Sequence, residues 1–183
     1  KIDPRKFSTL EQKAYWMNLY NALTVLAVHE NYEHLSQLKF QESLPEAAWA
    51  KQRVKIARQS LSLNDIEHRI LRPIFKDHRI LFGLNCTTLD CPNLSVKAYT
   101  GKTIKAQLKA AGVRFINNNI GLRYADGVLY ASRLFQDYAT DFAKDEKTLK
   151  KVFAHYAADM KALYALGYTG TINYTRDSRL NGR

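Results

Sequence analysis

The chain has 183 residues, of which 46% are hydrophobic and 25% are charged, values typical of a globular protein large enough for a substantial core. Its two cysteines are too few for a disulfide framework or a self-sufficient zinc site. No apolar run is long enough to cross a membrane.

The charge balance is basic, with 28 Lys and Arg residues against 17 Asp and Glu residues and a formal net charge of +11. Such a charge attracts acidic partners in general but does not identify one. The basic residues are scattered in short groups, so we expect the charge to be spread over several faces. Because the sequence carries no nucleic-acid-binding motif, a nucleic acid is not the expected partner.

A long helix is predicted near the start of the sequence, from Leu10 to His29. It is apolar on almost every side between Ala14 and Val28, which is typical of a buried helix. Asn18 and Asn21 interrupt this apolar run three residues apart, and buried amides need hydrogen-bonding partners. Either the two amides bond to neighbouring backbone and orient the helix, or they line a site in which one of them orients a histidine.

The remaining elements are predicted from periodicity and turn residues. They are a helical or irregular connection over 31–50, a β-hairpin over 52–62 turning near 58–60, a helix over 103–117, strands over 120–124 and 128–131 around an Asp126-Gly127 turn, a short helix over 132–142, a longer helix over 145–166 and a partly extended end over 168–183. This order predicts a single α+β domain over residues 1–183, with a small, mostly antiparallel sheet packed with helices. It also allows a papain- or transglutaminase-like fold.

The central stretch from Leu63 to Leu94 carries the candidate functional residues. A helix is predicted from Asp65, with Asn64 as its N-cap and Glu67 completing a capping box. Pro73 is expected to bend or end this helix.

A histidine on this helix and a cysteine after it form the main candidate site. His68 lies in or just beyond the first turn, where the positive end of the helix dipole favours a neutral imidazole. Arg79 to Cys86 is predicted to form a short buried strand that ends at the cysteine. Because an imidazole can lower the pKa of a neighbouring thiol, we predict Cys86 as a nucleophile and His68 as its base, with the amide of Asn85 holding an oxyanion.

Three stretches of the sequence resemble the motifs of a known family. They are AYWMNLYNALT near the start, LSLNDIEHRILRPIF with RILFGLNCTTLDCPNL in the centre, and SRLFQDYATDF from Ser132. They resemble the first helix, the central signature and the later S-x-x-F-x-x-Y-x-x-D-F segment of the DUF547 family, a domain of unknown function. The chain departs from the family pattern at its end, where Tyr174 to Asn181 replaces a Y-D-W-S-L-N-like sequence. The resemblance covers nearly the whole chain and implies no particular reaction.

Other uses of the two cysteines stay open. Cys86 and Cys91 enclose four residues, which is too long for the C-x-x-C redox motif but allows a structural or regulatory disulfide in an oxidising compartment. A metal held by both cysteines and His68 has no obvious fourth ligand, so no metal and no cofactor is expected. In papain- and transglutaminase-like proteins the cysteine usually precedes the histidine, whereas here it follows.

Further polar residues are candidates for support or binding. A side chain from Asn18, Asn21, Asn64 or Asp65 could orient the imidazole. Arg72 and Arg79 either pair with nearby aspartates or hold an acidic substrate group. The full set of supporting and binding candidates is Asn18, Asn21, Asn64, Asp65, Glu67, Arg72, Arg79 and Cys91.

Two functions are compatible with these residues. The first is a thiol-dependent hydrolase or transferase that uses Cys86 and His68. The second is a non-catalytic binding module that recognises an acidic small molecule or peptide, with Cys86 and Cys91 structural or redox-active. The start at Lys1 rather than Met suggests a processed or trimmed chain. If the chain is a processed form, a periplasmic or secreted location is expected over a cytoplasmic one.

Overall fold

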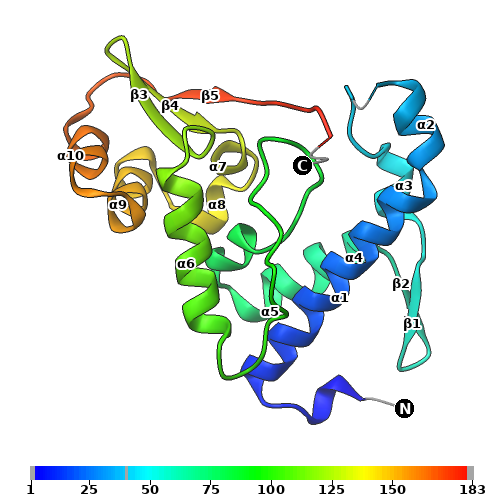
Figure 1. Ribbon diagram of the computed structural model, residues 1–183. Helices are drawn as coiled ribbons and strands as arrows, with labels where there is room; N and C mark the ends of the chain where they lie inside the picture. Colours follow the sequence, from blue (N-terminus) through cyan, green and yellow to red (C-terminus); the bar gives the residue numbers. More distant parts are fainter. Residues whose placement is uncertain (1–2, 40, 181–183) are drawn as a thin grey trace.

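The computed structural model describes residues 3–39 and 41–180 (Figure 1). The elements follow in the order η1 (Pro4–Lys6), α1 (Thr9–Glu30), α2 (Tyr32–Gln37), α3 (Glu46–Ala50), β1 (Val54–Ile56), β2 (Gln59–Leu61), α4 (Leu63–Asp65), η2 (Ile66–Leu71), α5 (Arg72–Phe75), η3 (His78–Phe82), α6 (Ile104–Asn117), β3 (Leu122–Ala125), β4 (Val128–Ser132), α7 (Leu134–Asp137), α8 (Ala139–Phe142), α9 (Glu146–Tyr156), α10 (Asp159–Gly167) and β5 (Asn173–Thr175). η1 and η3 are 3-10 helices, whereas η2 is π-helical. This mixture of helices and small sheets confirms the predicted α+β class.

The predicted opening helix is present as α1. Its first turn is capped where the Glu11 carboxylate accepts a hydrogen bond from the backbone N–H of Ser8, over 2.9 Å. Met17, Tyr20 and Ala27 on this helix are buried. α1 runs diagonally across the molecule in Figure 1, and the π-helix η2 packs against it. The helix therefore forms one wall of the region that carries His68.

Both predicted hairpins are also present. β1 and β2 pair antiparallel around Ala57 and Arg58, which both have positive φ angles. β3 and β4 pair antiparallel around Asp126 and Gly127, where positive φ angles suit a two-residue hairpin turn. β5 pairs with β4 in parallel and lies within the partly extended end that was predicted over 168–183. Residues 181–183 of that prediction lie outside the described part.

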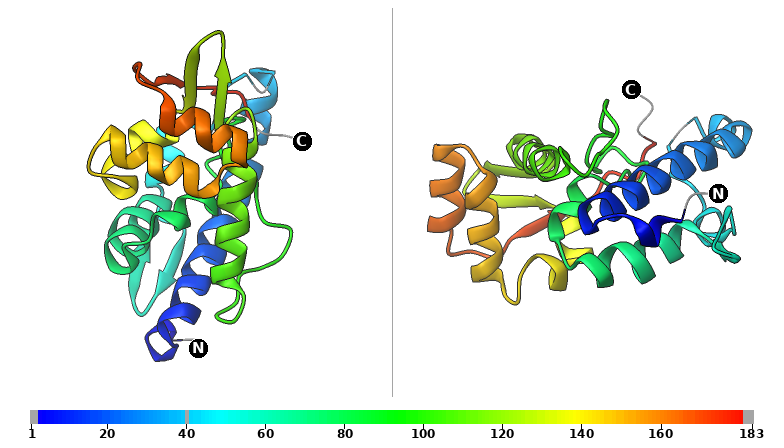
Figure 2. Two further views of the ribbon diagram at one scale, coloured as in Figure 1. Left: turned by 90° about the vertical axis from the view of Figure 1, so that its left-hand side faces the viewer. Right: turned by 90° about the horizontal axis from the view of Figure 1, so that it is seen from below.

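Two adjoining apolar clusters fill the interior. The first lies around α1, α3 and α4, and the second lies between α6, the three-stranded sheet and the helices α7 to α10. Figure 2 shows α9 and α10 side by side next to α6 and the sheet. η3 and α6 contribute buried residues to both clusters, so they join the two parts of the core.

The prediction of a strand from Arg79 to Cys86 is wrong. The chain forms the 3-10 helix η3 there and continues irregularly to the cysteine. The Asp77 carboxylate caps η3 by accepting a hydrogen bond from the backbone N–H of Arg79, over 3.1 Å. The following backbone bonds to the side chain of Asn21 rather than to a neighbouring strand. A polar side chain from α1 thus replaces the pairing that a strand would need.

The helix that carries His68 begins earlier than predicted. Ser62, not Asn64, is its N-cap: the Ser62 hydroxyl accepts from the backbone N–H of Asp65, and the Asp65 carboxylate accepts from the backbone N–H of Ser62. Pro73 was expected to bend or end the helix, and it does not end it at once. The π-helical turns of η2 end at Leu71, and α5 continues through Pro73 to Phe75.

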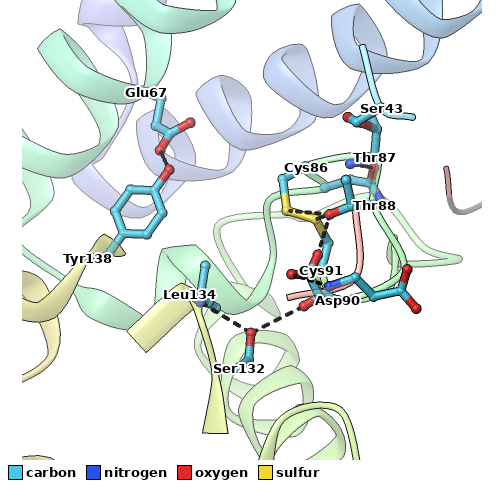
Figure 3. The surroundings of a disulfide bond; sticks show 12 residues. Ser43, Glu67, Cys86, Thr87, Thr88, Asp90, Cys91, Ser132, Leu134 and Tyr138 are labelled. Carbon is cyan, nitrogen blue, oxygen red and sulfur yellow. Dashed lines mark hydrogen bonds between the residues drawn. A yellow bond between two sulfur atoms is a disulfide. The ribbon is translucent and has the colours of Figure 1, made fainter. Parts of the chain in front are cut away.

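Two helices in the second half are interrupted where single helices were predicted. The 145–166 helix is broken into α9 and α10, because the side chain of Asn117 donates to the carbonyl of Tyr156 and accepts from the backbone N–H of Ala158. The 132–142 helix is divided into α7 and α8 at Tyr138. The side chain of Tyr138 points away from both short helices and towards Glu67 (Figure 3).

Candidate functional site

A cavity of about 370 Å³ lies between α1, η2, the loop after η3 and the start of α7. Its walls bring together residues that are far apart in the sequence. They include Tyr20 of α1, Asn64, Glu67 and His68 of the central helix, Cys86, Thr88 and Asp90 of the following loop, Ser132 and Tyr138 around α7, and Arg176 near the end. Of the predicted catalytic residues, Cys86 and His68 line this cavity, whereas Asn85 does not.

The two cysteines are joined to each other. Cys86 and Cys91 form a disulfide, with their Cα atoms 5.7 Å apart. The hydroxyl of Thr88 lies against both sulfur atoms (Figure 3). Neither sulfur is a free thiol, so the disulfide alternative describes this arrangement and the thiolate alternative does not. The same bond removes both sulfurs from the three-residue metal site considered with His68.

Asn21 holds the backbone that leads to the disulfide. Its side-chain nitrogen donates to the carbonyl of Gly83 and its side-chain oxygen accepts from the backbone N–H of Asn85. Asn18 makes the same kind of pair with Tyr99, accepting from its N–H and donating to its carbonyl. Both amides are hydrogen-bonded, as predicted, and they bond to backbone rather than to the imidazole of His68.

Asn85 has a local role in the loop. Its side-chain oxygen accepts a hydrogen bond from the backbone N–H of Thr87, over 2.9 Å. Thr87 has a positive φ angle of 70° and its hydroxyl lies 2.7 Å from that of Ser43. The Asn85 side chain therefore stabilises the turn between the cysteines, and its predicted oxyanion role stays a prediction.

The other side of the disulfide loop is covered by the end of the chain. The Asp90 carboxylate accepts from the backbone N–H of Asp177, and the backbone N–H of Leu89 donates to the carbonyl of Arg179. The segment after β5 runs alongside this loop in Figure 1. The segment brings Arg176 to the wall of the cavity.

Glu67 is the most unusual group in the cavity wall. It is 6% exposed, and its carboxylate accepts hydrogen bonds from the phenols of Tyr20, over 2.9 Å, and Tyr138, over 2.6 Å. Burial and the neighbouring carboxylate raise the pKa of both phenols far above the usual value, so both remain donors. Glu67 was predicted as a helix cap, but the structure uses it as a buried acceptor between α1, η2 and the start of α8.

His68 is oriented by an arginine. Its Nδ1 lies 2.7 Å from the guanidinium of Arg72, which can only donate, so Nδ1 is the accepting nitrogen of this pair. Nε2 lies 4.0 Å from the Glu67 carboxylate. The side chain is 44% exposed. The nitrogen that accepts is thus already bonded to Arg72 rather than directed at a sulfur.

The predicted arginines are paired with aspartates. Arg72 bonds to Asp141 of α8 and also stacks on the ring of Tyr138, 4.7 Å from its centroid. Arg79 bonds to Asp77, which also bonds to Lys13. Burial raises the pKa of Asp77, but the hydrogen bonds from Arg79 and Lys13 outweigh it and hold that pKa at about 2. Either guanidinium would therefore have to break its ion pair with an aspartate before it could bind an acidic substrate.

Asp65 serves the helix rather than the imidazole. Hydrogen bonds from the backbone and hydroxyl of Ser62, together with one from Arg69, lower its pKa to about 2. Asn64 lines the cavity but bonds to neither nitrogen of His68. The group that orients the imidazole is thus Arg72, which was predicted only as an ion-pairing or substrate-binding residue.

Sequence reasoning missed four residues of the site. Ser132 donates to the carbonyl of Asp90 over 3.4 Å and accepts from the backbone N–H of Leu134, and so ties the disulfide loop to the start of α7 (Figure 3). Tyr138 binds Glu67, and Thr88 contacts the disulfide. Ser132 and Tyr138 both belong to the SRLFQDYATDF segment, so that motif was the signal that could have found them. No local sequence signal pointed to Arg176.

Metal-binding clusters and membrane-spanning helices are absent from the described ranges 3–39 and 41–180. These residues contain no group of three or more His, Cys, Asp or Glu side chains arranged to hold a metal ion. Within the same ranges, no helix has the length and apolar character to cross a membrane.

Fold and site together define an α+β protein with a disulfide in the wall of a polar cavity. The chain matches the family described as "Protein of unknown function, DUF547" over residues 4–116, more than half of its length, and it belongs to that family. No curated protein and no solved structure matches the chain. The papain- or transglutaminase-like fold therefore stays a prediction.

Proposed function

We propose that this DUF547 protein is a binding module for a small molecule or a short peptide that carries an acidic group, and that part of this ligand occupies the cavity beside the disulfide. The disulfide between Cys86 and Cys91 carries the proposal, because it engages the sulfur that a thiol enzyme would use as its nucleophile. The cavity volume of about 370 Å³ is within the range of small-ligand sites. Several of its polar groups, among them Glu67, His68 and Ser132, are held by hydrogen bonds within the protein, which keeps this part of the wall in place before a ligand arrives.

The experiment is an NMR titration of the oxidised, ¹⁵N-labelled protein, without reductant, against mixtures of short peptides, amides and thioesters. Binding should shift the backbone amides of His68, Thr88 and Ser132, which line the cavity. The ligand itself should be recovered chemically unchanged. Asn64→Trp places a large ring in the wall and should abolish these shifts. Asn119→Trp, at an exposed turn away from the cavity, is the matched control and should keep them. Chemical conversion of a ligand by the oxidised protein would contradict the proposal.

A second candidate function is a thiol-dependent hydrolase or transferase that acts once the disulfide is reduced. The observation in its favour is that Cys86 and His68 line the same cavity. We place the binding function first because Nδ1 of His68 already accepts a hydrogen bond from Arg72. This nitrogen would have to leave Arg72 before it could take a proton from a thiol.

Cys91→Ser tests this second candidate directly, because it leaves Cys86 as a free thiol without added reductant. If the protein is a thiol enzyme, iodoacetamide should alkylate Cys86 rapidly even at a pH below the ordinary thiol pKa of ~8.5. Adding His68→Ala should then slow the reaction by more than about tenfold. Cys86→Ser, which leaves Cys91 alone, is the control and should react slowly. A Cys86 thiol whose labelling is slow or indifferent to His68 would remove the enzyme candidate.

A further inference from the structure

A second cavity adjoins the first across His68. It has a volume of about 500 Å³, and both cavities use His68 and Leu81 as wall residues. The remaining wall of the second cavity comes from the start of α5, the turn after it, the start of η3, and α8. The two cavities therefore lie next to each other, with the His68 imidazole and Leu81 in the wall of both.

The first cavity has an excess of negative charge. Its wall contains two guanidiniums, one of which, on Arg133, is already paired with Asp137 over 3.1 Å. Four carboxylates line the same cavity, on Glu46, Glu67, Asp90 and Asp137. Glu46 makes no ion pair or hydrogen bond within the described residues and is exposed at the wall. This cavity therefore favours a cationic group.

The second cavity has the opposite excess. Its wall carboxylates, on Asp77 and Asp141, are already bonded to Lys13 and Arg79 and to Arg72 respectively. Lys76 also lines this cavity, and its ammonium group has no acidic partner in the part of the chain that the structure describes. Burial lowers the pKa of His78, which adds no charge near neutral pH. An anionic group is thus favoured on this side of His68.

We infer that the two cavities form one site for an extended zwitterionic ligand, a short peptide with a free amino group and a free carboxylate. The amino group lies in the first cavity near Glu46 and Glu67, the chain passes His68, and the carboxylate lies in the second cavity near Lys76. The inference rests on the proposed binding function and adds the polarity of the ligand and the position of its acidic group.

The test uses mixed-sequence peptide pools of two to six residues, prepared with both ends free, with the amino end acetylated, with the carboxyl end amidated, or with both ends blocked. Each pool is titrated into the oxidised ¹⁵N-labelled protein. Pools with both ends free should shift amides in both cavities and bind most tightly. Each blocked end should weaken binding by about three- to fivefold, the usual worth of one exposed ion pair.

Two variants assign each end of the peptide to a cavity. Lys76→Ala should weaken binding of pools with a free carboxylate and leave amidated pools unchanged. Glu46→Gln should weaken pools with a free amino group and leave acetylated pools unchanged. Lys144→Ala and Glu42→Gln change the same charges at exposed positions outside both cavities and are the matched controls.

The outcomes separate this inference from the proposed function. Binding in the first cavity that is indifferent to the blocked ends, or to Lys76→Ala, would overturn the zwitterionic ligand and leave the binding module standing. The opposite assignment of ends would also overturn the inference. Absence of shifts in both cavities with every pool, together with no shifts from the mixtures of short peptides, amides and thioesters, would overturn the binding function itself.

Discussion

Asn21 fixes the backbone on which Cys86 stands. Its amide spans a break in the chain's own hydrogen bonding, binding the carbonyl of Gly83 and the N–H of Asn85 at once. The residue is 7% exposed, so water cannot easily take its place. One side chain of α1 therefore stabilises the stretch that leads from η3 to the disulfide.

Asn21→Leu should lower the free energy of unfolding by about 3 kcal/mol, because it leaves a carbonyl and an N–H without partners in the interior. Asn18→Leu is the matched control: the same amide-to-backbone pair is lost, but at a half-buried position where water can replace it, and we expect about 1 kcal/mol. Urea denaturation of both variants measures the difference. Equal losses would show that the Gly83 to Asn85 backbone does not depend on Asn21.

At the scale of elements, one ionic group joins α1 to η3. The ammonium of Lys13 lies 2.6 Å from the Asp77 carboxylate, and both side chains are about one-tenth exposed. The same carboxylate caps η3 and binds Arg79. Asp77 is thus both a helix cap and the partner of a buried lysine, and its removal affects both elements together.

Asp77→Asn should lower the free energy of unfolding at pH 7 by ~3 kcal/mol, because Lys13 is left buried without its counter-charge. The pKa of Asp77 is about 2 in the folded protein, below the usual carboxyl value of 3.8. Its contribution is therefore complete above pH ~4 and is lost as the pH falls towards 2.

The variant should consequently lose less stability than the parent between pH 4 and pH 2, as measured by urea denaturation at each pH. Asp126→Asn, at the exposed hairpin turn, is the control and should follow the parent. If the free energy of unfolding of the variant falls as steeply with acid as that of the parent, other carboxylates cause the acid sensitivity.

The elements that could be predicted from sequence are those with local causes. α1 follows from a long run that is apolar on almost every side, α6 follows from periodic apolar residues, and the β3–β4 hairpin follows from the Asp126-Gly127 turn. The failures have causes that lie far away in the chain. The η3 region depends on Asn21, about 60 residues earlier, and the break between α9 and α10 depends on Asn117 of α6.

The site divides in the same way. Motifs in one central stretch indicated His68 and Cys86 as a candidate pair, and both residues line one cavity, although their predicted catalytic roles stay predictions. The phenols on Glu67 come from α1 and from Tyr138, on either side of that stretch, and nothing local to Glu67 indicates them. Sequence spacing also left the disulfide open as one of several pairings, and the geometry brings the two sulfurs together.

At the scale of the whole molecule, the core does not divide where the family match ends. The match stops at residue 116, one residue before the end of α6. Phe82, which is fully buried, has ring contacts with Phe135, Phe142 and Tyr156, all beyond that point. α6 itself supplies Ile104 and Leu108 to one cluster and Phe115 to the other. We therefore propose that the 183 residues fold as one domain.

A chain cut after Asn117 should fail to fold cooperatively, because Phe82 and Phe115 would each lose burial worth ~2–3 kcal/mol when the ring partners beyond residue 117 are removed. The full chain, without reductant, should unfold in one urea transition. Fluorescence of Trp16 and Trp49, both in the first cluster or packed against it, reports that part, and far-UV circular dichroism reports all helices. Coincident curves for the full chain and no cooperative curve for the fragment are the expected result. Separate transitions, or a fragment that unfolds cooperatively, would instead show that residues 4–116 form a domain of their own.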